Sequence, residues 1–394
     1  MKKFILLLAF PLTVFCQINN PVSASPKAEH NFLIDKEVAL KHKDSLVSLG
    51  WSFQEKFPFF YKTTATGKAP KSCAFSPNDS IVSVTLLSEY ETAVQFFRTH
   101  SIQNIIKTLH PSYHTKDRNK GYAEGIWKND NEFWFTRMTT GDFFIWHKNN
   151  DSIEQYDSKG RWTKIIEMNP SQNLVAMSHW SSDDVTVFEV NTKNFVRRIN
   201  TGETPRGIVW LNDSVFVTAL FEDGDVEVFN VNNGKKIHHI KGYGGAARDL
   251  QYDEENKIIY YSNMGVAKIF KYDWIRKKYL GEIKVDYKPN TIRLSADNKY
   301  LFVSCRGPNN PKGYTRRSPR DGDIFIIDAE KLETIVKWRA GNQPTGLDVS
   351  SCGTMLAQTD FLDNKLTIWL VALPEYTSLK NRLDIKGGGK KFHF

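Results

Sequence analysis

Hydrophobic and polar positions alternate in short runs along the chain, most clearly in residues 202–241. Here an apolar run at 207–210, a β-branched and aromatic run at 215–218, the segment VEVFNV and the alternating segment KKIHHI are separated by turns rich in Asn, Asp and Gly. Runs of this length, bounded by such turns, predict four short β-strands and no helix of useful length. Four strands in about 40 residues are typical of one blade of a β-propeller.

The same pattern recurs as a unit: a small residue or proline, one variable residue, a small residue, an apolar run, a turn and a second apolar run. Seven units are found, at residues 69–85, 122–137, 162–178, 204–218, 246–262, 288–304 and 343–359. Their variable residues are 53, 40, 42, 42, 42 and 55 positions apart, and insertions near 110–122 and at 306–323 account for the two long intervals. The repeat predicts an all-β fold, a seven-bladed β-propeller of four-stranded antiparallel blades.

The last unit lacks a good candidate for its fourth strand, because the residues after its third strand at 366–371 are weak strand formers. A single strand near 57–64 precedes the first unit and has no blade of its own. We expect this N-terminal strand to join the last blade, which closes the ring and removes an open strand edge. The expected boundaries are a lead-in at 17–56 with one or two helical turns, a propeller at 57–375 and a tail at 376–394.

Two lysines and the apolar run FILLLAFPLTVF stand at the N-terminus. This pattern predicts a signal peptide at 1–16, with cleavage before Gln17 or as late as Ala24, and the run is too short to span a bilayer. A lipid on Cys16 is disfavoured because the bulky Phe15 precedes it. No other stretch is apolar enough to cross a membrane, so we expect an exported protein of the periplasm or the extracellular space.

The composition, 13% aromatic and 25% charged with a mean hydropathy of −0.44, is that of a folded globular protein. The net charge of +9, or +7 without the two leader lysines, is spread along the chain and does not indicate nucleic-acid binding. Cys73, Cys305 and Cys352 are too few for a disulfide scaffold, although one bridge stays open as an alternative. With no metal-ligand spacing, haem site or phosphate loop, we expect neither a metal nor a cofactor.

Three segments carry a family resemblance: TPRGI, then KPNTIRLSADNKYLFVS followed by RGPNNP, and GNQPTGLDVSSCGTMLAQTDFLDNKLTIWLV. They resemble the YVTN-type, lactonase-like seven-bladed β-propellers, secreted bacterial-type repeat proteins, and the resemblance covers residues 60–375. It implies the fold more than the function, because such propellers include lactone hydrolases, electron-transfer subunits and binding modules.

In a propeller the innermost strand of each blade lines a central channel, and its first residues lie at one mouth. The variable residues occupy this position, so we expect a ring of Lys71, Glu124, Lys164, Arg206, Arg248, Asn290 and Thr345. The 306–323 insertion, which begins at Arg306, is expected on the same face as a mobile basic flap. Converging Arg and Lys side chains suit a carboxylate, a phosphate or an anionic glycan. In the alternative interpretation these cations pair with Glu124 and with carboxylates of the surrounding loops.

We therefore expect a non-enzymatic module that binds an anionic small molecule, a glycan or a protein partner over the channel mouth. The candidate ligand-binding residues are Lys71, Lys164, Arg206, Arg248, Asn290, Arg306 and Thr345. A lactonase-like hydrolase at the same mouth is one alternative, with Glu124 and His179 as candidates for proton transfer. A scaffold whose outer blade edges dock a protein partner is another.

Overall fold

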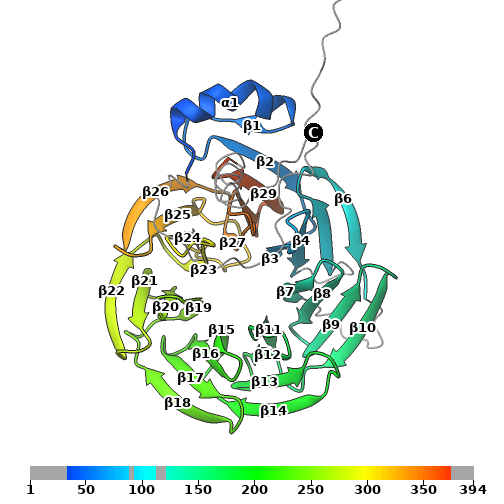
Figure 1. The fold of residues 1–394 in the computed structure, drawn as a ribbon, viewed down its shortest axis with the longest axis vertical. Helices are drawn as coiled ribbons and strands as arrows, with labels where there is room; N and C mark the ends of the chain where they lie inside the picture. The colour runs from blue at the N-terminus through cyan, green and yellow to red at the C-terminus, as the bar shows by residue number, and fades with distance from the viewer. Residues whose placement is uncertain (1–32, 88–92, 112–120, 374–394) are drawn as a thin grey trace, which may run out of the picture.

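A computed structural model describes residues 33–87, 93–111 and 121–373 (Figure 1). In these residues seven antiparallel sheets stand around a central axis, each with its first strand innermost. The predicted all-β, seven-bladed propeller is confirmed. The described part of the chain contains no helix that is both long and apolar enough to cross a membrane.

The first three blades comprise these strands: β3 (Pro70–Phe75), β4 (Ile81–Leu86), β5 (Val94–Arg98) and β6 (Ser101–Leu109); β7 (Tyr122–Asn129), β8 (Glu132–Arg137), β9 (Asp142–His147) and β10 (Ser152–Asp157); β11 (Thr163–Met168), β12 (Leu174–His179), β13 (Asp184–Glu189) and β14 (Phe195–Asn200). The next three comprise β15 (Pro205–Asn212), β16 (Val215–Leu220), β17 (Val226–Asn230) and β18 (Lys235–Ile240); β19 (Ala247–Asp253), β20 (Ile258–Asn263), β21 (Lys268–Asp273) and β22 (Lys278–Lys284); β23 (Pro289–Leu294), β24 (Tyr300–Cys305), β25 (Asp323–Asp328) and β26 (Glu333–Arg339).

The seventh blade is built from both ends of the propeller. Its C-terminal strands are β27 (Pro344–Val349), β28 (Met355–Asp360) and β29 (Lys365–Leu370). Strand β2 (Phe60–Ala65) pairs antiparallel with β29, from Phe60 opposite Leu370 to Ala65 opposite Lys365, and β1 (Ser52–Phe53) adds a fifth strand. Closure of the ring by the N-terminal strand is therefore confirmed.

Helix α1 (Lys36–Ser48) lies outside the ring beside β1 and β2 (Figure 1). Asp35 caps it, because its carboxylate accepts a hydrogen bond from the Val38 amide at 2.8 Å. Its 13 residues exceed the one or two turns that we expected in the lead-in. The sequence hides this helix because only Ala39 and Leu46 are buried, too few for a helical apolar stripe. The expected signal peptide at 1–16, its later cleavage limit at 24 and the tail at 376–394 lie outside the described residues.

The core is divided among the interfaces between blades. One cluster joins the seventh and first blades through Phe60, Val84, Phe97 and Ile368, and Ala39 and Leu46 of α1 extend it. Another joins the first and second blades, where Phe96 packs 4.4 Å from Trp146 between ring centroids. Each blade is thus stabilised by its neighbours, which explains why the apolar pattern repeats with the blade period. Cys73, Cys305 and Cys352 take part in no disulfide among the described residues, so the bridge left open by the sequence is not formed.

Candidate functional site

All seven inner strands share one irregularity, a register shift that follows their first residue. The shifts lie between Pro70 and Ser72, Tyr122 and Gly125, Thr163 and Ile166, Pro205 and Ile208, Ala247 and Leu250, Pro289 and Ile292, and Pro344 and Leu347. We call the residue just inside each shift the inner ring; its members are Lys71, Ala123, Lys164, Arg206, Arg248, Asn290 and Thr345. Six of these seven positions were predicted from the sequence.

The second blade departs from the prediction, because Ala123 and not Glu124 stands in the inner ring. The sequence pattern matched Gly125 to Gly207, yet in the pairing to the second strand Gly125 takes the place of Ile208. Glu124 therefore lies one residue farther along the strand, where it lines the channel.

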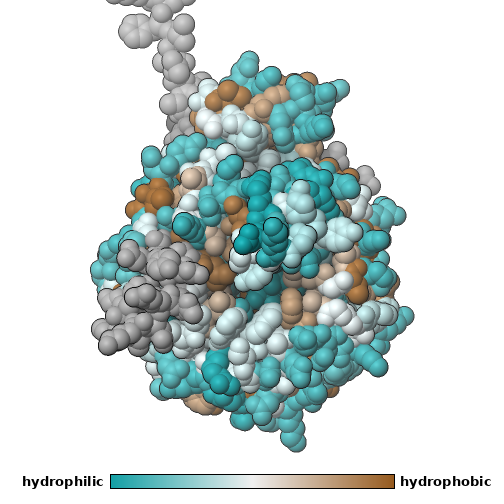
Figure 2. All heavy atoms as spheres, turned by 180° about the vertical axis from the view of Figure 1, so that it is seen from behind, coloured by the Kyte–Doolittle hydropathy of each residue, from teal (hydrophilic) through white to brown (hydrophobic). Residues whose placement is uncertain are grey.

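A second regularity surrounds the inner ring. In every blade the residue after the second strand donates its backbone amide, at 2.8 to 3.1 Å, to the carbonyl two positions before the inner-ring residue. We call these residues the rim; they are Leu87, Met138, Trp180, Phe221, Met264, Arg306 and Phe361. Because one hydrogen bond fixes each rim residue beside its inner-ring neighbour, the two sets together form the channel mouth. On the face seen in Figure 2, the centre of the ring is hollowed and hydrophilic residues lie in the hollow.

The mouth holds five cations that have no carboxylate at ion-pair distance among the described residues. These mouth cations are Lys71, Lys164, Arg206, Arg248 and Arg306, and none forms an ion pair with another described residue. Arg206 is 4% exposed and Arg248 is 7% exposed, and the buried Nε atoms of Arg248 and Arg306 have no hydrogen-bond partner in the described structure. The alternative interpretation, in which these cations pair with carboxylates, is met only by longer-range attraction of Glu124 and Asp249 to Arg206 and Arg248, because no ion pair forms among the described residues.

Burial lowers the pKa values of all five mouth cations, and repulsion by other mouth cations adds to the shift of every one except Arg206. The pKa of Lys71 falls well below its usual range, first through burial and then through the charges of the other four mouth cations. Burial, followed by Arg206 and Arg248, likewise holds the pKa of Lys164 well below normal. Burial lowers the pKa of Arg306 to about 10, with Arg206 contributing. Charges that shift one another in this way lie close together, so the mouth is a concentrated positive site.

The two polar members of the inner ring differ in what they offer a ligand. Asn290 is fully buried and donates from Nδ2 to the carbonyl of Thr345 at 2.7 Å, while its Oδ1 has no partner in the described structure. The Thr345 hydroxyl donates to the carbonyl of Gln343 at 2.9 Å. Thr345 is thus occupied by the fold, whereas the Asn290 oxygen is not.

The insertion at 306–323 is fastened to the ring. Its Arg317 pairs with Asp363 and Asp321, and Arg320 pairs with Asp286. The backbone amide of Ser318 donates a hydrogen bond of 2.9 Å to Asn342 Oδ1. These ion pairs and hydrogen bonds replace the expected mobile flap with an anchored loop, and they leave Arg306 as its contribution to the mouth cations.

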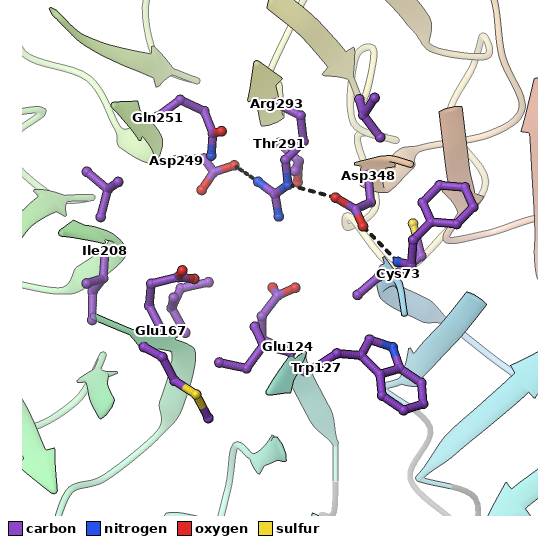
Figure 3. A pocket seen from close by; sticks show the side chains of 18 of the residues that line it. Cys73, Glu124, Trp127, Glu167, Ile208, Asp249, Gln251, Thr291, Arg293 and Asp348 are labelled. Carbon is purple, nitrogen blue, oxygen red and sulfur yellow. Dashed lines mark hydrogen bonds and ion pairs between the residues drawn. The ribbon is translucent and has the colours of Figure 1, made fainter. Parts of the chain in front are cut away.

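Inside the mouth the channel becomes acidic. A cavity of about 540 Å³ lies there, and Glu124, Glu167, Asp249 and Asp348 line it (Figure 3). Arg293 reaches between two of these carboxylates, with Nη1 3.2 Å from Asp249 and Nε 3.4 Å from Asp348. Although burial opposes it, these neighbours raise the pKa of Arg293. Burial raises the pKa of Glu124 to about 7 and that of Glu167 to about 8.

The sequence analysis named Glu124 but missed Arg293 and the other three channel-lining carboxylates, Glu167, Asp249 and Asp348. They stand one and three residues after the inner-ring position, since alternate residues of a strand point to the same side. Reading each unit at a period of two from the residue that follows its variable residue would have found Asp249, Arg293, Asp348 and Glu167.

His179, the other candidate for proton transfer, ends β12 but points into the blade. It is fully buried, and its Nδ1 and Nε2 lie 3.1 Å from Thr163 Oγ1 and 2.7 Å from Thr186 Oγ1. Burial lowers its pKa to about 3, so the ring is neutral at physiological pH. These contacts make His179 a packing residue of the third blade. In the described residues no group of three or more His, Cys, Asp or Glu is arranged to hold a metal ion.

Comparison with known proteins agrees with this architecture. The model of a protein family described as a 6-bladed beta-propeller (DUF5128) matches residues 201–335. The match spans three blades, β15 to β26, and therefore does not count the blades of the ring. Antigen Lp49 of Leptospira interrogans serogroup Icterohaemorrhagiae serovar copenhageni (strain Fiocruz L1-130) is 33% identical over 321 residues, which cover 79% of this chain and 69% of the relative.

Proposed function

Because the chain belongs to the β-propeller family that includes antigen Lp49 of Leptospira interrogans, we propose that it is a binding module for an anionic ligand at the channel mouth. The observation that carries the proposal is the set of five mouth cations, which have no carboxylate partner among the described residues. The fold and the relationship to an antigen fit a binding or interaction module in general. The proposal that the ligand is an anion depends on the mouth cations.

An unpaired cation is costly to bury, because it loses hydration without gaining a countercharge. Several such cations at one opening raise the cost further through mutual repulsion. A bound carboxylate or phosphate removes both penalties at once and can accept paired hydrogen bonds from Arg206 and Arg248. The anion therefore gains its affinity from a site that the folded protein has already organised.

The acidic channel limits how deep an anion can enter. Glu124 lies within the electrostatic reach of Arg206, and beyond it Asp249 and Asp348 share the single countercharge of Arg293 and leave negative charge in the channel. We therefore propose that a ligand anion is held at the mouth end of the cavity, where Arg206 and Arg248 line it. This two-part charge distribution supports a binding site at the inner ring and the rim.

The proposal includes export of the protein. The predicted signal peptide at 1–16 motivates it, and a relative named as an antigen agrees with a location outside the cytoplasm. Microsequencing of the mature N-terminus after expression in a bacterial host tests this, and a protein that retains residue 1 in the cytoplasm would contradict it.

A lactonase-like hydrolase is the second candidate. The observation that favours it is Glu124, whose pKa of about 7 suits proton transfer and which shares a cavity with Arg206 and Arg248. Turnover of γ-butyrolactone and glucono-δ-lactone, with and without divalent cations, distinguishes the two functions. Hydrolysis that the substitution Glu124→Gln abolishes would replace the binding proposal with the enzymatic one.

Titration calorimetry at pH 7 and low ionic strength, with sulfate, phosphate and citrate as probes, tests the binding proposal. We expect at least one probe to bind, and the double variant Arg206→Gln/Arg248→Gln to weaken it about 30-fold or more. Arg276→Gln is the matched control, because Arg276 lies in the turn between β21 and β22 with 70% of its side chain exposed. If none of the probes binds, or if the double variant binds as the wild type does, the proposal is wrong and a scaffold that docks partners through its outer blade edges takes its place.

A further inference from the structure

The rim is apolar where the inner ring is charged. Six of its seven members are Leu, Met, Phe or Trp, and Arg306 is the exception. Met264 and Phe361 are buried, but the other four are partly exposed at the end of the propeller, where polar residues are the norm. A set of apolar side chains fixed beside unpaired cations is therefore a feature that anion binding alone does not require.

Aromatic rings concentrate in the sector formed by the third and fourth blades. Trp180 and Phe221 of the rim lie 4.6 Å apart between centroids, and Trp162 is 42% exposed. We call Trp162, Trp180 and Phe221 the aromatic sector.

The aromatic sector is in direct contact with the mouth cations. Lys164 Nζ lies 5.0 Å from the Trp162 ring centroid and 5.1 Å from that of Trp180. Arg206 Cζ lies 5.9 Å from the Trp180 centroid. These cation–π contacts hold two positive groups against aromatic surface, so an anion bound to them comes to rest beside the rings.

From this juxtaposition we infer that the ligand joins its anionic group to a ring with an apolar face, which packs on the aromatic sector. The inference rests on the proposed anion site and names its ligand class. Two kinds of molecule share this chemistry: aromatic acids, which stack through their π-face, and acidic sugars, which pack through the C–H face of the ring. A small inorganic anion would leave the aromatic sector in contact with water.

Phosphate monoesters that share the same anionic group test the contribution of the ring to affinity separately from that of the charge. Calorimetry compares inorganic phosphate with phenyl phosphate and with glucose 6-phosphate. We expect at least one ester to bind about tenfold tighter than inorganic phosphate, the usual gain from one stacked ring. A preference for phenyl phosphate assigns an aromatic acid, and a preference for glucose 6-phosphate assigns an acidic sugar.

The substitution Trp180→Leu should reduce this preference to about twofold, because it removes a ring on which the ester packs. Trp162→Leu serves the same purpose if Trp180→Leu does not fold, because Trp162 is half exposed. Phe195→Leu, an exposed change on outer strand β14 of the same blade, is the control and should keep the full preference.

The inference is overturned if both esters bind no tighter than inorganic phosphate, or if the preference survives both tryptophan substitutions. In either case the anion site itself stands. Failure of all three probes would instead refute the anion site together with the inference.

Discussion

Arg293 and Asp249 form an ion pair between neighbouring inner strands, with Nη1 3.2 Å from Oδ2. Asp249 directly follows Arg248, yet its carboxylate neutralises Arg293 inside the channel and not the guanidinium beside it in the sequence. The fold thus directs the Asp249 carboxylate into the channel, away from an ion pair with Arg248. Arg248 is left buried at the mouth with an Nε that no described residue satisfies.

The substitution Arg248→Leu should stabilise the protein while it weakens anion binding. Removing a buried cation that has no partner removes its desolvation penalty and its repulsion, so we expect the free energy of unfolding to rise by about 1 kcal/mol. Urea unfolding at pH 7 measures the change. Arg293→Leu is the contrasting variant, because it leaves two channel-lining carboxylates without a countercharge. It should lower the free energy of unfolding by about 2 kcal/mol or more. A loss of stability in Arg248→Leu would show that Arg248 is a structural residue.

Glu167 should make stability depend on pH. Its pKa in the folded protein is about 8 against a usual 4.5, so folding favours the protonated carboxyl. The resulting stabilisation is fully present below pH 4.5 and is lost as pH rises through 8. Between pH 5 and pH 9 we expect Glu167→Gln to lose about 1–2 kcal/mol less unfolding free energy than the wild type, a reduced figure because the carboxyl faces an open channel. Equal losses in urea unfolding at the two pH values would contradict the raised pKa.

Anion affinity should fall as pH rises from 6 to 9. Over this interval Glu124 and Glu167, with pKa values of about 7 and 8, acquire negative charge below the mouth. Lys71 and Lys164 add to the effect, since their lowered pKa values make them lose protons earlier than exposed lysines.

Sulfate is the probe for this dependence, because its own charge is constant in that range. We expect its affinity to drop about five- to tenfold in calorimetry, and Glu124→Gln to reduce the drop. Affinity that is constant or rises with pH would refute the proposed electrostatics of the mouth.

Ring closure should depend on Phe60, the first residue of β2, which is fully buried between the seventh and first blades. We expect Phe60→Ala to cost about 3–4 kcal/mol, since it opens a cavity at the joint of the ring. Phe195→Ala, at a position 46% exposed on β14, should cost less than about 1 kcal/mol. Thermal and urea unfolding compare the two, and similar losses would show that the N-terminal strand is not essential to closure.

Much of the fold could be predicted because each of the first six blades is formed by one continuous segment of the sequence that contains its strands and turns. Residues 202–241 contain four apolar runs and the turns between them, and strands β15 to β18 fall on those runs. The closure by β2 was also predictable, since an unpaired N-terminal strand and a missing C-terminal strand complement each other. The length of helix α1 was underestimated because its buried residues pack against Trp51 and Phe59, which lie outside the helix and add nothing to a helical apolar pattern.

At the mouth, the sequence by itself determined which side chains meet: a repeat period fixes the angular position of each inner strand, so Arg206 and Arg248 were placed at one opening. Only the tertiary structure decided their electrostatic state. The register shift of β7 moves Glu124 into the channel, and Asp249 turns to Arg293. Pairing depends on directions and distances of a few ångströms across blades, which a linear pattern does not contain. The sequence determines that cations stand at the mouth, and the tertiary structure determines that they have no ion-pair partners among the described residues.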